Sequence, residues 1–119
     1  MKYLMLIKHS EDYRSQPIPE ALLSAMGEFV NQGFKSGVLK DTAGLKPTEE
    51  GFRVRSSGGK LKVKDGPFTE AKEVIGGYAM VEVKSKEEAR EMARQFMELH
   101  RLHWPAFEGE CEVRPVEDQ

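Results

Sequence analysis

Runs of apolar residues and apolar–polar alternation predict four strands in one sheet. The segment from Leu4 to Ile7 is apolar at four consecutive positions, which is typical of an inner strand covered on both faces. The last segment, residues 110–116, alternates between apolar and polar residues. The predicted strands of this sheet are residues 2–9, 38–45, 75–83 and 110–116.

Helical spacing of apolar residues predicts two helices. The first starts near Pro19, because proline suits the first position of a helix, and stops at Gly37, which is suited to terminate it. The second starts at Ser85, which forms a capping box with Glu88, and it ends at residues 104–105. This second helix has the clearest division into an apolar and a charged side.

A hairpin is predicted between the first helix and the third strand of the sheet. Residues 52–55 and 60–64 alternate between apolar and basic side chains across a turn at residues 56–59. This pattern favours a hairpin with one solvated face. The basic side chains of that face are Arg53, Arg55, Lys60, Lys62 and Lys64.

Without the hairpin, the elements follow the β-α-β-β-α-β order of an α+β, ferredoxin-like fold with an antiparallel sheet. Both helices then cover the same face of the sheet. The strand at residues 2–9 is apolar on its second face as well, and no third long helix is predicted to cover it. We therefore expect a second copy of the chain to cover this face, which gives a homodimer.

Length and composition are typical of a single soluble domain, residues 1–119. The 18 basic and 20 acidic residues give a formal net charge of −2, which does not favour nucleic acid as a partner. Cys111 is the single cysteine and forms no internal disulfide, so a reducing cytoplasm is the simplest location. The longest apolar stretch, residues 3–7, is far too short for a membrane span.

The stretch at residues 65–68, Asp-Gly-Pro-Phe, predicts a tight turn before the third main strand. Asp65 can accept hydrogen bonds from backbone N–H groups ahead of it, and the glycine permits a positive φ. Phe68 gives the turn an apolar anchor. After the turn, Gly76 and Gly77 lack Cβ atoms, which indicates close approach of another chain, a helix or a ligand.

The run DGPFTEAKEVIGGY, residues 65–78, resembles the signature of the DGPF domain, a branch of the YCII-related proteins. Residues 1–7 and 112–116 are similar to this branch too, so the resemblance covers nearly the whole chain. It implies two ferredoxin-like subunits in a dimeric α+β barrel. In YCII-like proteins a histidine and an aspartate are regarded as the catalytic pair, but neither position is matched to a residue here. The family as a whole has no settled biochemical activity.

His9 and Asp65 are the candidates for acid–base chemistry. His9 lies where the first strand leaves the core, and a histidine there can exchange protons near neutral pH. The alternative for His9 is an edge histidine bonded to a loop. Asp65 combines a fixed geometry with an aromatic neighbour that excludes water, and its alternative is an aspartate that only closes a turn.

Five residues are candidates for substrate binding. Phe68 and Lys72 lie in or after the turn, and Lys72 is suited to hold an anionic substrate, although most such lysines are simply solvated. His100, His103 and Trp104 follow the apolar side of the second helix, and we expect them to line one wall of a cavity between helix and sheet.

The spacing of the two histidines also suits a shared metal ion, with Glu108 or Glu110 completing the site. Two histidines followed by tryptophan are equally suited to packing beside the core. No second pair of histidines or cysteines supports the metal, so no metal site is assigned.

The leading hypothesis is a cytoplasmic homodimer that binds a small organic molecule in each subunit. Any reaction would be proton transfer, with His9 or Asp65 as acid or base and Lys72 as the anion holder, and it would need no cofactor. The alternative is a non-catalytic binding or regulatory module with a transcription-related partner, since proteins of this kind are sometimes associated with sigma factors. The sequence does not decide whether the protein is an enzyme.

Overall fold

The computed structural model describes residues 1–13 and 16–118, and its elements follow the predicted order. Arg14 and Ser15, in the loop after the first strand, lie outside the described residues. The elements are β1 (Lys2–His9), α1 (Glu20–Lys35), β2 (Leu39–Gly44), the 3₁₀ helix η2 (Thr48–Glu50), β3 (Phe52–Ser57), β4 (Lys60–Asp65), β5 (Val74–Glu82), α2 (Lys86–His103) and β6 (Gly109–Pro115).

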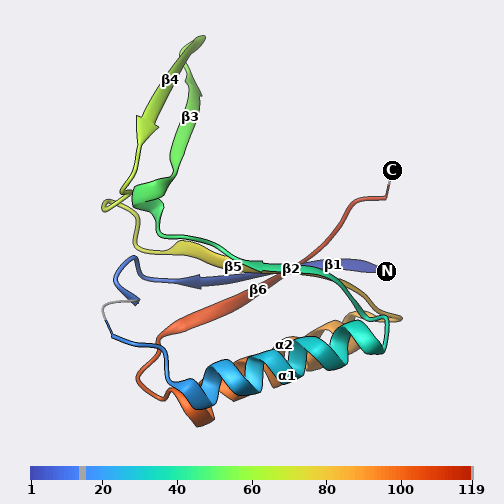
Figure 1. The fold of residues 1–119 in the computed structure, drawn as a ribbon. Coiled ribbons are helices and arrows are strands. Elements are labelled where there is room, and N and C mark those ends of the chain that lie inside the picture. Colours follow the sequence, from blue (N-terminus) through green and yellow to red (C-terminus); the bar gives the residue numbers. More distant parts are fainter. Residues whose placement is uncertain (14–15, 119) are drawn as a thin grey trace.

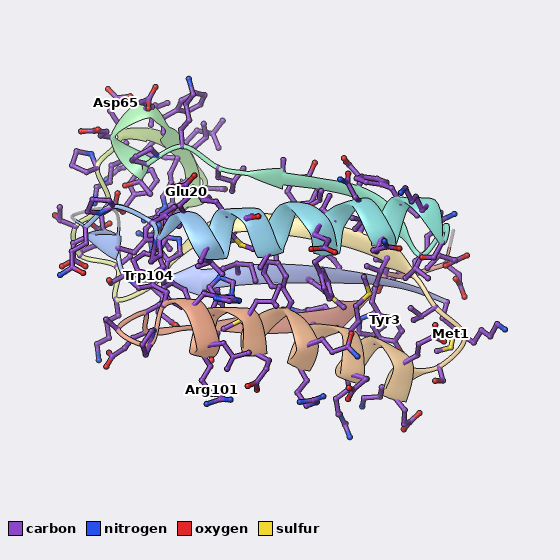
Figure 2. The ribbon with its side chains drawn as sticks, turned by 60° about the horizontal axis from the view of Figure 1, so that its bottom comes forward. Met1, Tyr3, Glu20, Asp65, Arg101 and Trp104 are labelled. Atoms are coloured by element: carbon purple, nitrogen blue, oxygen red, sulfur yellow. The ribbon has the colours of Figure 1, made fainter. Side chains whose placement is uncertain are left out.

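Four of the strands form one antiparallel sheet in the order β2-β5-β1-β6. This is the strand order of a ferredoxin-like fold with the hairpin β3–β4 set aside. Helices α1 and α2 lie side by side against one face of the sheet (Figures 1 and 2). The predicted α+β class and antiparallel ferredoxin-like sheet are confirmed. Neither helix, within the described residues, is long and apolar enough to cross a membrane.

Local sequence signals set the helix ends. The Ser85 hydroxyl accepts a hydrogen bond from the backbone N–H of Glu88 at 3.1 Å, and the Glu88 carboxylate accepts one from the N–H of Lys84. A capping box therefore starts α2, as predicted. Pro19 caps α1 instead of being its first residue, and Gly37 follows its end with a φ of 79°.

The core lies between the helices and the sheet. Tyr3 and Met5 of β1 point toward the helices and pack with Val81 of β5, which is fully buried. At Gly33 in α1, an added Cβ would come within 2.9 Å of the Cβ of Leu39. Glycine there lets α1 approach β2 closely.

The second face of the sheet is apolar at its centre. Alternation along β1 directs Leu4 and Leu6 away from the helices, and the strand register places Met80 and Tyr78 of β5 beside them. No described helix covers this face (Figure 1). The expectation that β1 is apolar on both faces is confirmed. We call this surface, which consists of Leu4, Leu6, Tyr78, Met80 and their neighbours, the open face.

Strands β3 and β4 form a separate two-stranded sheet that projects from the side of the main sheet opposite the helices (Figure 1). Gly58 and Gly59 form its turn with positive φ at both positions, as a type I′ turn requires. Every residue of both strands is exposed within the single chain, so no described part of the same chain covers either face of the hairpin. Alternation distinguishes two faces of a strand, but it cannot show whether a second layer covers either of them.

Candidate functional site

A cavity of about 440 Å³ lies between the two helices and the sheet. This volume falls in the range of small-molecule sites. Most of its wall is apolar, and polar and aromatic groups gather toward the end where β1 and α2 finish. In Figure 2, Trp104 lies at that end of the molecule, whereas Tyr3 lies toward the other. The lining residues with chemical interest are His9, Tyr13, His100, Trp104, Phe107 and Cys111.

His9 is the last residue of β1 and is only 4% exposed. Its Nδ1 lies 2.8 Å from the carbonyl oxygen of Ser10, and since a carbonyl only accepts, Nδ1 carries the proton. The ring stacks on Tyr13 with centroids 3.5 Å apart. A Cβ at residue 76 would lie 2.7 Å from Cδ2 of His9 and closer still to Nε2. Gly76 therefore provides the space that the imidazole occupies.

His100 is the second buried histidine of the cavity wall. Its Nδ1 lies 3.1 Å from the carbonyl oxygen of Phe96, so this nitrogen also donates a proton to the backbone. Burial lowers the pKa of His100, and the bond to Phe96 only partly opposes this effect. Among the described residues, its Nε2 has no hydrogen-bond partner. A neutral imidazole in this tautomer can accept a proton or hydrogen bond at Nε2.

Phe107 connects the two histidines. Its ring centroid lies 6.3 Å from that of His9 and 4.9 Å from that of His100, and it also stacks on Trp104. The two imidazoles thus belong to the same aromatic wall. Phe107 and Tyr13 were not predicted as site residues, because both lie in irregular segments where no periodicity indicates the direction of a side chain.

Cys111 reaches the cavity from β6, on the helix-covered side of the sheet. Burial raises the pKa of its thiol to about 11. The side chain therefore stays protonated at neutral pH and is a weak nucleophile. Its role in the wall is that of a small, weakly polar group.

The Asp-Gly-Pro-Phe turn lies outside the cavity, and Figure 2 shows Asp65 at the margin of the molecule. Asp65 is the exposed last residue of β4 and does not line the cavity with His9. The turn is held instead by its backbone: Gly66 N–H donates to the carbonyl of Gly51 at 2.9 Å, and Phe68 N–H donates to the Thr48 hydroxyl at 3.1 Å. Gly66 does not adopt the positive φ that glycine permits.

The other residues of this motif hold the base of the hairpin. Phe68 is buried, and the guanidinium of Arg53 lies 3.8 Å above its ring. Glu70 accepts hydrogen bonds from Lys64 and Arg53, and the bond from Lys64 is the main cause that lowers the pKa of Glu70. Lys72 is exposed. Neither Phe68 nor Lys72 lines the cavity.

His103 does not share the position of His100. It is the last residue of α2, its side chain is exposed, and it is absent from the cavity wall, so the expectation that both imidazoles project inward is wrong for His103. Helical spacing predicts the direction of a side chain but not where the covering layer ends. Among the described residues, no group of three histidine, cysteine or acidic side chains is placed to hold a metal ion.

Replacing His100 by phenylalanine is expected to reduce the acid sensitivity of folding. The pKa of His100 in the folded chain lies below its ordinary value of 6.5, so the unfolded chain binds more protons between the two values. The free energy of unfolding therefore falls as the pH drops below 6.5, and above it this group has no effect. Phenylalanine keeps the contacts with Phe96 and Phe107 but does not titrate.

Urea unfolding of wild type and variant, followed from neutral to mildly acidic pH, measures this difference. The matched control is His103→Phe, since His103 is exposed at the end of the same helix. The control should retain the pH dependence of the wild type. An equal loss of stability on acidification in wild type and His100→Phe would contradict the burial of a neutral imidazole at this position.

Comparison with known proteins places the chain in a family. The model of the YCII-related domain matches residues 1–100, which include β1 to β5 and most of α2. An uncharacterised protein of Rhizobium meliloti (strain 1021) is 35% identical over 82 residues. That alignment covers 69% of this chain and 62% of the relative, so the chain spans less than two-thirds of the relative's length. Because the family model matches most of the chain, the chain belongs to the YCII-related domain family.

Proposed function

We propose that the protein binds a small organic molecule in the cavity between α1, α2 and the sheet. The observation that carries this proposal is the pair of buried histidines, His9 and His100, on one wall of a largely apolar cavity. Protein interiors are normally packed with few voids larger than a water molecule. Burying the imidazole of His100 also costs free energy unless its Nε2 finds a partner. A bound molecule accounts for both features.

The chemistry of the wall indicates what kind of molecule fits. Apolar and aromatic side chains favour a mainly apolar ligand, and Nε2 of His100 accepts a hydrogen bond from a hydroxyl or enol group. If that group is acidic, the same nitrogen removes its proton, and no cofactor takes part in this step. Because Asp65 and Lys72 lie outside the cavity, the acid–base roles fall to His9 and His100.

The functional unit in this proposal is a cytoplasmic homodimer of the DGPF branch, joined through the open face. Removing its apolar centre, which includes Leu4 and Leu6, from water is favourable in free energy. Polar groups near it already have partners: Tyr78 donates to Asp41 at 2.9 Å, and Lys8 donates to Glu112 at 2.8 Å. Covering such paired groups costs less than covering unpaired ones.

Two nitroaromatic compounds test the cavity directly. The chain has one tryptophan, Trp104, and it lines the cavity, so a bound nitroaromatic should quench its fluorescence. 4-Nitrophenol carries a hydroxyl donor, whereas 4-nitroanisole is the matched ether without one. Wild type is expected to bind the phenol about tenfold more tightly, which is the difference made by one hydrogen bond of about 1.4 kcal/mol.

Three variants separate the parts of the proposal. Ala79→Leu places a larger side chain in the cavity and should weaken both compounds, while His100→Phe should remove only the preference for the phenol. Ala25→Leu is the control, because Ala25 lines the outer groove between the helices and not the cavity. Quenching that is unchanged by Ala79→Leu would show that the compounds bind elsewhere and would overturn the proposal.

A further inference from the structure

We propose that the hairpin β3–β4 is a dimerisation arm whose apolar face packs against a second copy of this chain. The inference rests on the proposed homodimer and extends it, because it assigns part of the interface to a segment outside the main sheet.

The arm exposes an apolar face that its own chain does not cover. The strand register pairs Val54 with Val63 and places Phe52 and Leu61 on the same face. These four side chains are 67% (Phe52), 56% (Val54), 74% (Leu61) and 68% (Val63) exposed. An isolated two-stranded hairpin is at best marginally stable in water, and contiguous exposed apolar patches usually mark interaction sites. The arm therefore needs a partner to be stable.

The other face of the arm is already used by its own chain. Arg53 and Lys64 lie opposite each other on that face, and both donate to the carboxylate of Glu70. Arg53 also covers the ring of Phe68. These contacts fix the base of the arm through its basic face, so the apolar face points away from the chain's own turn.

The position of the arm favours a second copy of the chain as its partner. The arm rises on the side of the sheet opposite the helices, which is the side of the open face (Figure 1). A copy that covers the open face therefore lies beside the arm. In a two-fold dimer the same contact is made twice, because each arm reaches the other subunit.

Approximate areas support the same partner. Four strands about 4.8 Å apart and 6 to 9 residues long give an open face of roughly 19 by 25 Å, or about 480 Å². Stable interfaces bury about 800 Å² on each partner. One face of an arm with strands of 6 residues adds roughly 200 Å². Together the open face and the arm give roughly 680 Å², which lies within the range of such interfaces, whereas the open face alone does not.

Sedimentation of two matched double variants tests the arm. Val54→Thr with Val63→Thr makes the apolar face polar and keeps the β-branched shape that favours strands. Arg55→Gln with Lys62→Gln alters the neighbouring cross-strand pair on the opposite face. The valine pair is expected to raise the dimer dissociation constant about a hundredfold, since each change occurs twice in the dimer. The control is expected to stay within a few-fold of wild type.

The outcomes distinguish the arm from the dimer itself. A dimeric wild type with an unchanged dissociation constant in the valine variant overturns the arm and leaves the homodimer standing. A wild type that is monomeric at micromolar concentration overturns both.

Thiol labelling gives a second measurement that does not depend on the valine variant folding. The thiol introduced by Val63→Cys should react with Ellman's reagent about tenfold more slowly in the dimer than in the dilute monomer, whereas the reactivity of the thiol introduced by Lys62→Cys should not change. Cys111 contributes little, because the pKa of its thiol is raised to about 11. Equal protection at both positions, or at neither, overturns the arm.

Discussion

Replacing Gly66 by alanine is expected to lower the free energy of unfolding by about 3 kcal/mol and the melting temperature by roughly 10 °C. The added Cβ would lie 2.6 Å from the carbonyl carbon of Thr48 and closer still to its oxygen. Both atoms belong to the backbone of η2, so neither can rotate away. Alanine must therefore separate the turn from η2 and break the hydrogen bond between Gly66 and Gly51.

Gly51→Ala is the matched control in the same loop. A Cβ at this position would meet only the carbonyl oxygen of Thr48, at an ordinary contact distance of 3.6 Å. This variant should stay within about 0.5 kcal/mol of wild type. Thermal unfolding of both variants measures the difference. If Gly66→Ala melted with the control, the turn would not be held against η2 in solution.

Gly76→Ala is expected to have the second largest effect, and it acts at the cavity. The new Cβ would overlap the ring of His9, which is buried and stacked on Tyr13 and so has little room to move. We expect a loss of about 2 kcal/mol in the free energy of unfolding. Binding of 4-nitrophenol should weaken by about tenfold, because the displaced ring enters the cavity.

A double-mutant cycle separates this clash from other effects of the methyl group. In a His9→Ala background the ring is gone, so adding Gly76→Ala should cost little, and the coupling free energy should be about 1–2 kcal/mol. Gly44→Ala on the neighbouring strand is the control, since its Cβ would meet no atom within 4 Å. Additive effects of His9→Ala and Gly76→Ala would rule out the packing of His9 against Gly76.

The contacts of the Asp-Gly-Pro-Phe motif give it a structural role. Its glycine allows the turn to lie against η2, and its phenylalanine is buried under Arg53 at the base of the arm. Asp65 itself is exposed and does not line the cavity. The motif therefore positions the hairpin, and through the proposed dimer it contributes to the assembly and not to the chemistry of a single subunit.

Much of the candidate site was predictable in its parts. His9 marks the end of the apolar run of β1, and the spacing of His100 from Phe96 on α2 predicts an inward imidazole, as the structure has it. Trp104 is also buried at the cavity. Tyr13 and Phe107 were not predicted as part of the site. They have no periodic neighbours, and only the fold brings their loops to the cavity.

The sequence by itself determined the order of the elements, their ends and the apolar character of both faces of β1, because these depend on short-range periodicity, caps and turns. Only the tertiary structure decided which glycines allow a close contact and with which group. Gly76 lies against the ring of His9, and Gly66 lies against the backbone of Thr48. It also decided that no described part of the same chain covers the apolar face of the arm. These outcomes depend on contacts between segments far apart in the chain, and local patterns carry no information about such distances.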